Sequence, residues 1–118
     1  MPLKPGHIEL FVRDPMQAKE FYARGLGFRI EEIQQELFVW MSLGSLTVLL
    51  RPGRKAETPH TYQDAPIGIV LYTDDLPGAQ AMLEERGVEF RGTDGSDNCL
   101  TFCDPDGNWF QLVNPDQH

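Results

Sequence analysis

The chain has 118 residues, of which 18 are acidic and 10 are basic, so its formal charge is −8. This length suits one ordinary domain or two small halves that share a core, and a hydrophobic content of 41% excludes a disordered chain. An acidic chain without a basic patch does not attract nucleic-acid phosphates, and an anionic membrane surface would repel it. Neutral or cationic small molecules remain open as partners.

The composition also bears on location. The N-terminal residues lack the long apolar run of a signal peptide, and the longest apolar stretches are far too short to span a membrane. Cys99 and Cys103 are separated by about 13 Å if their segment is extended, which is too far for a disulfide. Two free thiols predict a reducing compartment, and we expect a cytoplasmic protein.

The first half of the chain predicts one strand, one helix and three further strands. Residues 6–12 are rich in β-formers, and Asp14 followed by Pro15 is typical of a helix start. Ala18, Phe21 and Tyr22 have the i, i+3, i+4 spacing of a buried helix face, and Gly25 is predicted to end the helix. Three strands are expected at 28–34, 37–43 and 45–51.

The second half repeats this order. Residues 67–73 predict a strand, Asp75 a helix start and Gly87 a helix end. Strands are expected at 88–93, 99–103 and 108–114. The residue types of the segment 104–107 (DPDG) predict a turn. The segment lacks the ligand spacing of an EF-hand loop, so we do not expect a calcium site there.

The two halves also align residue by residue. A shift of 61 places Asp14 on Asp75, a shift of 62 places the Arg-Gly pair at 24–25 on the pair at 86–87, and a shift of 63 places Leu49 on Leu112. This register is kept across a helix, its end and a distant strand, which indicates an internal duplication of a βαβββ unit.

Several segments then resemble one protein family. Residues 6–14 (GHIELFVRD), 21–22 (FY) and 26–28 (LGF) resemble the opening of vicinal oxygen chelate proteins, the superfamily of glyoxalase I, bleomycin-resistance proteins and extradiol dioxygenases. Residues 104–108 (DPDGN), followed by Gln111 and Leu112, resemble its closing strand. The resemblance implies an α+β fold of two βαβββ modules whose mixed sheets curl around a cavity, which is often completed by a second chain.

We therefore expect a single domain over 1–118, with module one at about 1–52, a linker at about 53–65 and module two at about 66–118. An open sheet edge in each module favours closure by a second copy, so a homodimer is expected.

The resemblance also marks four positions that hold a metal in metal-dependent members. Here these positions carry His7, Val48, Gly68 and Gln111, where Val48 follows from Gln111 by the shift of 63. One imidazole and one neutral amide are too few donors for a divalent ion. We therefore predict no metal and no cofactor. A weak divalent site at His7 and Gln111, with help from Glu9, is the alternative.

Strand alternation predicts which side chains face the cavity. His7, Glu9 and Phe11 share one face of the first strand, and the repeat extends that face. The predicted ligand-binding set is mostly apolar and aromatic, as expected for an organic ligand; it comprises His7, Glu9, Phe11, Trp40, Val48, Gly68, Tyr72, Trp109 and Gln111. Phe11, Tyr72 and Trp109 could instead simply fill the interior, and Phe38 with Trp40 or Val39 with Met41 could form the core.

Two functions follow from this pattern. The leading interpretation is a metal-free small-molecule-binding protein similar to the bleomycin-resistance branch, which sequesters an antibiotic or toxic compound, with a flat and often cationic ligand. The alternative is an isomerase, lyase or dioxygenase-type enzyme in which His7, with Glu9 beside it, acts as the catalytic base, with or without a weak metal site.

Overall fold

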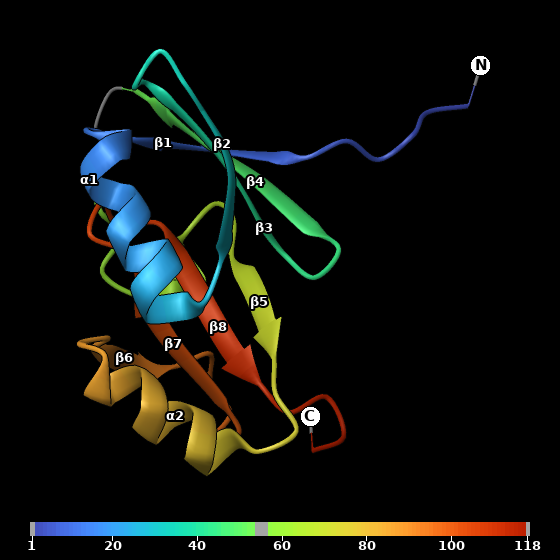
Figure 1. Cartoon of the computed structure of the whole chain (residues 1–118). Helices are drawn as coiled ribbons and strands as arrows, with labels where there is room; N and C mark the ends of the chain where they lie inside the picture. Colours follow the sequence, from blue (N-terminus) through green and yellow to red (C-terminus); the bar gives the residue numbers. More distant parts are fainter. Residues whose placement is uncertain (1, 54–56, 118) are drawn as a thin grey trace. The chain divides into compact units, whose positions relative to one another are not determined.

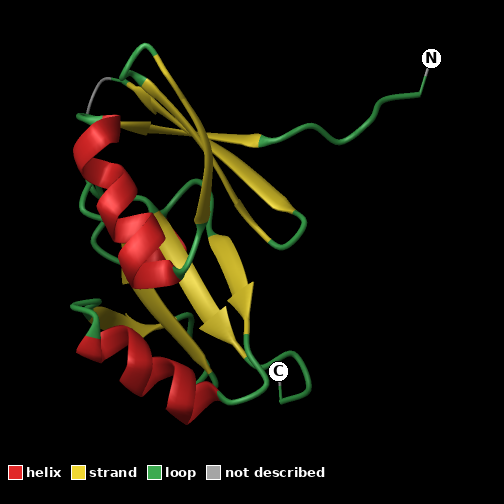
Figure 2. Cartoon of the chain, viewed as in Figure 1, coloured by secondary structure: helices red, strands yellow, loops and turns green. Residues whose placement is uncertain are grey.

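A computed structural model describes residues 2–53 and 57–117, and the chain divides into two compact units, one up to residue 55 and one from residue 56 (Figure 1). The division falls inside the predicted linker. Each unit has its own helix and its own sheet (Figure 2). The prediction that both units form one domain around one cavity stays a prediction.

The first unit is a four-stranded sheet with one continuous helical segment. Its elements are β1 (Ile8–Val12), α1 (Pro15–Glu20), the π-helix η1 (Phe21–Leu26), β2 (Arg29–Gln34), β3 (Phe38–Leu43) and β4 (Leu46–Pro52). The strand order is β1-β4-β3-β2, in which β1 runs parallel to β4 and the other pairs are antiparallel.

The second unit repeats this topology after a short 3₁₀ turn. Its elements are η2 (Tyr62–Asp64), β5 (Ile69–Tyr72), α2 (Leu76–Glu85), β6 (Phe90–Thr93), β7 (Cys99–Cys103) and β8 (Trp109–Val113). The strand order β5-β8-β7-β6 matches that of the first unit, with β5 parallel to β8. The α+β class and the duplicated βαβββ unit are therefore confirmed, and neither described sheet closes into a barrel.

Both helices begin where the sequence predicts. The Asp14 carboxylate accepts a hydrogen bond from the Met16 amide at 3.1 Å, and the Asp75 carboxylate accepts one from the Gly78 amide at 3.1 Å. Each side chain satisfies a backbone N–H that has no partner inside the helix.

The end of the first helix differs from the prediction. Gly25 lies buried within η1, and Gly27 is the left-handed residue, with φ of 85°. Gly87 ends α2 as predicted, with φ of 93°. The cap-to-glycine distance is 27 − 14 = 13 residues in the first copy and 87 − 75 = 12 in the second. The wider π turn takes up the extra residue, which a pattern of helical periodicity does not reveal.

Each sheet buries one face beneath its helix. In the first unit α1 packs on β3 and β4, and the fully buried side chains there include Tyr22, Val39, Met41, Val48 and Leu50. In the second unit the rings of Phe102 and Phe110 stack with centroids 5.2 Å apart, and Leu83 of α2 is buried. Val39 and Met41, rather than Phe38 and Trp40, therefore form the core of the first sheet.

The turn between β7 and β8 is held by one buried carboxylate. Asp104 accepts hydrogen bonds from the Asp106 amide at 2.9 Å, the Asn108 amide at 2.8 Å and the Asn108 side-chain amide at 2.8 Å. Gly107 adopts φ of 90°, which a glycine reaches without strain. The predicted turn is thus confirmed.

The cysteines are free, as predicted: Cys99 is buried and Cys103 half-buried. Burial raises the pKa of the Cys103 thiol to about 11, so this thiol is a weak nucleophile at neutral pH. No helix among residues 2–53 and 57–117 has the length and apolar character that crossing a bilayer requires.

Candidate functional site

The first sheet leaves its second face, the one away from α1, partly open. The alternation of β1 places His7, Glu9 and Phe11 on this face, and Phe11 is 53% exposed. Cross-strand register then extends the face, because Glu9 lies opposite Leu49, Leu49 opposite Trp40, and Phe11 opposite Arg51. We call the set His7, Glu9, Phe11, Phe38, Trp40, Leu49 and Arg51 the open face.

A chain of polar contacts crosses the open face. His7 Nε2 lies 2.8 Å from Glu9 Oε2, and Arg51 Nη1 donates to Glu9 Oε1 at 2.9 Å. The Arg51 hydrogen bond, and next the His7 contact, hold the pKa of the Glu9 carboxyl below its usual value. Glu9 is therefore an anion at neutral pH, with one partner on each oxygen.

Aromatic rings frame these polar groups. The His7 ring meets the Trp40 ring edge to face, with centroids 4.6 Å apart, and Trp40 Nε1 donates to Gln34 Oε1 at 3.1 Å. The Arg51 guanidinium lies 5.5 Å from the Phe11 ring centroid and 5.7 Å from that of Phe38. The open face thus joins apolar rings to a few fixed polar groups, a composition typical of organic-ligand sites.

The predicted place of Val48 is wrong. Val48 pairs in register with Ile8, so its side chain lies on the helix-covered face, where it is 1% exposed. Comparing the pairs Glu9–Leu49 and Val70–Gln111 shows that Gln111 corresponds to Leu49, at a shift of 62 instead of 63. A slip of one residue in a strand moves every side chain to the opposite face.

In the second unit the corresponding face is filled over β8, whereas Val70 and Tyr72 of the edge strand β5 stay 42% and 72% exposed on the same face. Tyr62 of η2 lies over Gly68, and a Cβ at position 68 would overlap its hydroxyl. The Tyr62 ring also meets the Trp109 ring, with centroids 6.2 Å apart, and Trp109 Nε1 donates to the Pro59 carbonyl at 3.0 Å. Trp109 is consequently only 3% exposed. Burial, and next the nearby Asp94 carboxylate, raise the pKa of Tyr62.

Gln111 also lies on this filled face and is occupied there. Its Nε2 donates to Asp94 Oδ2 at 2.5 Å, and the side chain is 6% exposed. Gly68, Trp109 and Gln111 therefore lie on one face, where Gly68 and Trp109 pack against residues 59 and 62 of the preceding segment and Gln111 binds Asp94. Their predicted role in ligand binding stays a prediction. We call the set Pro59, Tyr62, Gly68, Asp94, Trp109 and Gln111 the filled face.

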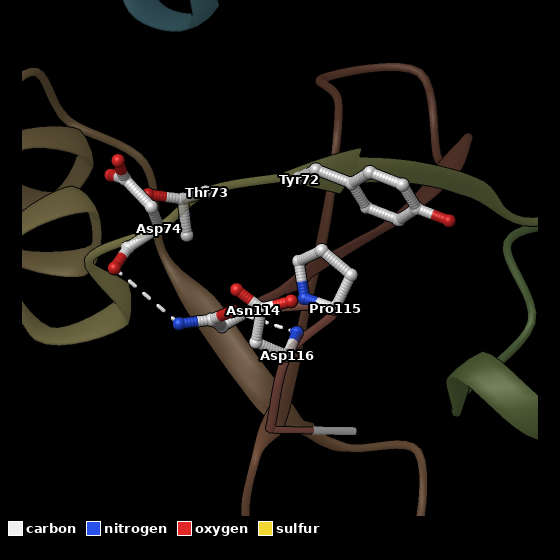
Figure 3. A pocket seen from close by; sticks show the side chains of 6 residues that line it. All are labelled: Tyr72, Thr73, Asp74, Asn114, Pro115 and Asp116. Carbon is white, nitrogen blue, oxygen red and sulfur yellow. Dashed lines mark hydrogen bonds between the residues drawn. The ribbon is translucent and has the colours of Figure 1, made fainter.

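Tyr72 lies apart from that set. It is 72% exposed and, with Thr73 and Asp74, borders an open pocket of about 500 Å³ at the ends of β5 and β8 (Figure 3). The other side of the pocket is formed by residues 114–116, where Asn114 Nδ2 donates to the Asp74 carbonyl at 3.4 Å. This pocket was not predicted, because it depends on chain segments beyond both strands.

The donor set at the four family metal positions does not fit a divalent ion. The first unit supplies His7 and Leu49 and the second supplies Gly68 and Gln111, so only one imidazole and one amide are present. His7 already contacts Glu9, whose other oxygen binds the Arg51 cation. Within the described segments, no three His, Cys, Asp or Glu side chains come close enough to ligate one metal ion.

The sequence reasoning missed three residues of these faces: Arg51, Tyr62 and Asp94. The correct strand register would have found Arg51, because it then alternates with Leu49 on the side of Glu9. Tyr62 lies in the predicted linker and Asp94 follows β6, and neither has a periodic pattern that marks it.

Solved structures of similar fold carry several functions. An antibiotic-binding protein, TnmS3 from Streptomyces sp. CB03234, is 24% identical with a TM-score of 0.70, over 97% of this chain and 99% of that one. The fosfomycin resistance protein FosX from Mesorhizobium loti is 19% identical with a TM-score of 0.73, over 97% and 93%. Lactoylglutathione lyase from Agrobacterium tumefaciens is 16% identical with a TM-score of 0.72, over 98% and 96%.

No curated protein matches the chain. The family model described as "Glyoxalase/Bleomycin resistance protein/Dioxygenase superfamily" matches residues 4–112, which is nearly the whole sequence. This match agrees with the duplicated βαβββ topology and with the motifs at both ends of the chain. The chain belongs to the Glyoxalase/Bleomycin resistance protein/Dioxygenase superfamily.

Proposed function

We propose that the chain binds a flat organic molecule on the open face of its first unit and sequesters it without a metal ion. The observation that carries this proposal is the exposure of Phe11, at 53%, on a sheet face that also holds Trp40 and His7. A half-exposed phenylalanine on a face that carries further rings gains by stacking on an aromatic ligand. The family membership and the fold shared with the antibiotic-binding TnmS3 support a compound of antibiotic type.

The absence of suitable donors argues for binding rather than metal chemistry. The family's reactions at a divalent ion need about three strong protein ligands, and this chain has His7 alone at those positions. We therefore propose no step through a metal.

The experiment titrates 2-naphthol, a flat and neutral probe, into the protein by calorimetry, next to a thermal-shift screen of aromatic antibiotics. We expect saturable binding that Phe11→Ala weakens about 3- to 10-fold, since an aromatic pair contributes about 0.5–1.5 kcal/mol beyond its area. Tyr72→Ala is the matched control, because it removes an exposed ring from the second unit. Equal losses in both variants, or no binding by any ring compound, would contradict the proposal.

An enzymatic function is the second candidate, and the His7–Glu9 contact at 2.8 Å is the observation that favours it. A carboxylate that orients an imidazole is an arrangement used in general base catalysis. The test is His7→Ala: an enzyme would lose turnover by orders of magnitude, whereas a binding protein would lose little affinity. If the His7→Ala variant keeps its affinity and the wild type shows no turnover, the result would support a protein that binds its ligand without converting it.

We also propose that the protein is a homodimer of the cytoplasm. The strands β1 and β5 are edges of their described sheets, and unpaired edges favour pairing with a further chain. Free Cys99 and Cys103 suit a reducing compartment. Light scattering at micromolar concentration tests the dimer, and a monomeric mass would overturn it.

A further inference from the structure

Arg51 of β4 is the residue of the open face whose bonding capacity is least used. Its guanidinium lies between the Phe11 and Phe38 rings, at 5.5 and 5.7 Å from their centroids. Rings on both sides hold the planar group in place and remove part of its hydration. Because Arg51 lies opposite Phe11 in the sheet register, the backbone also fixes its position.

The guanidinium has more donors than the protein satisfies. Arginine carries five N–H groups, and the described residues accept a hydrogen bond from only one of its nitrogens, Nη1, which binds Glu9. Nε is buried and has no acceptor among those residues. Since 40% of the side chain is exposed while Nε is buried, the unused donors within reach of a bound molecule are those of the Nη groups.

The charge of Glu9, by contrast, is already balanced. One oxygen accepts from Arg51 and the other contacts His7, so a cationic ligand would have to displace an existing partner. Glu36 of the turn between β2 and β3, and Glu31 and Glu32 of β2, are further carboxylates of this unit, and among the described residues none of them is a hydrogen-bond or ion-pair partner of Arg51. β3 separates the two on β2 from β4. Two strand spacings amount to about 9–10 Å, close to the Debye length of physiological salt, so these charges act weakly at Arg51.

We propose that Arg51 determines specificity on the open face, and that it selects a flat aromatic ligand bearing an ionised acid oxygen, such as an aromatic carboxylate. The ring of the ligand lies against Phe11 and Trp40, and its carboxylate accepts hydrogen bonds from the unused Arg51 donors. A charge-assisted hydrogen bond from an exposed Nη group to a carboxylate is stronger than a bond between neutral groups. This inference rests on the proposed function and replaces the cationic ligand expected from the sequence with an anionic one.

The test compares three probes that share one ring system and differ in charge: 2-naphthoate, 2-naphthol and 2-naphthylmethylamine, titrated by calorimetry at pH 7.5 and 0.15 M salt. We expect 2-naphthoate to bind about 10-fold more tightly than neutral 2-naphthol, as a charge-assisted hydrogen bond provides. The cationic amine should bind most weakly.

Two variants locate the effect. Arg51→Gln should remove the preference for 2-naphthoate over 2-naphthol, while Arg51→Lys should keep part of that preference because it keeps the charge. Arg24→Gln is the matched control, since it removes the same charge from the 85% exposed Arg24 side chain on η1. Thermal denaturation confirms that each variant is folded.

Each outcome decides a different claim. If 2-naphthol binds but 2-naphthoate binds no better, or if Arg51→Gln keeps the preference, the inference about Arg51 is overturned and the proposed function stands. A preference for the amine likewise overturns it. If no probe binds at all, the proposed function fails, and this inference fails with it.

Discussion

The two sheets share one topology but fill the face away from the helix to different extents, although the edge strand β5 of the second sheet also keeps Val70 and Tyr72 exposed on it. In the first unit this face keeps Phe11 half-exposed and Arg51 partly unsatisfied. In the second unit Tyr62 occupies the space above Gly68, and Trp109 is almost fully buried. The comparison shows that the duplicated framework is set by the helix-covered core, whereas the opposite face can be either left open or filled by the chain itself.

Substituting the two tryptophans tests most directly whether the two faces differ in packing. We expect Trp109→Ala to lower the free energy of unfolding by about 3–5 kcal/mol, because it leaves a cavity beneath Tyr62. Trp40→Ala should cost only about 1–2 kcal/mol, since that ring is partly exposed. Urea denaturation followed by circular dichroism measures both, and similar losses would show that the two faces are equally packed.

The contact between Tyr62 and Gly68 predicts a smaller effect. Gly68→Ala places a Cβ against the Tyr62 hydroxyl and should cost about 1–3 kcal/mol through overpacking. In a Tyr62→Ala background the same substitution should be nearly neutral, so a double-mutant cycle reveals the coupling. Gly6→Ala is the matched control, because a Cβ there meets nothing within 4 Å. Additive effects of Gly68→Ala and Tyr62→Ala would refute the filled face.

The smallest expected effect concerns Glu9 on the open face. Arg51 first and His7 next lower the pKa of Glu9 from 4.5, so its pairing stabilises the fold above that pH. This contribution is lost as the pH falls through the lowered value, because protonation removes the attraction. The melting temperatures of the wild type and Glu9→Gln should therefore converge between pH 6 and pH 3. A constant difference across that range would show that the carboxylate charge is not involved.

The sequence predicted the architecture well because the signals for it are local and duplicated. Asp14, Asp75 and Gly87 stand where helices begin and end, and the eight strands fall within two residues of their expected bounds. Internal repetition doubled the evidence for each element. The family resemblance implies the same topology as the internal repeat, so both observations predict one fold.

The site was predicted less completely because it depends on register and on segments without periodicity. One residue of error between the copies moved Val48 onto the wrong face and hid Arg51. Tyr62 fills its face from a segment in which only a short 3₁₀ turn is regular, so no pattern of spacing marks it. His7, Glu9, Phe11 and Trp40 lie on one face of the first sheet, where strand alternation and the family motif agree, and their role in binding stays a prediction.

The π-helix η1 has a consequence for how the two copies diverged. An inserted residue in an ordinary helix turns every later side chain by about 100°, which would carry Leu26 and Phe28 away from the core. Here the wider turn confines the insertion to Phe21–Leu26, and Tyr22, Leu26 and Phe28 all stay buried. The helical segment therefore accommodates the extra residue within η1. The strands that follow keep the same face buried as in the other copy.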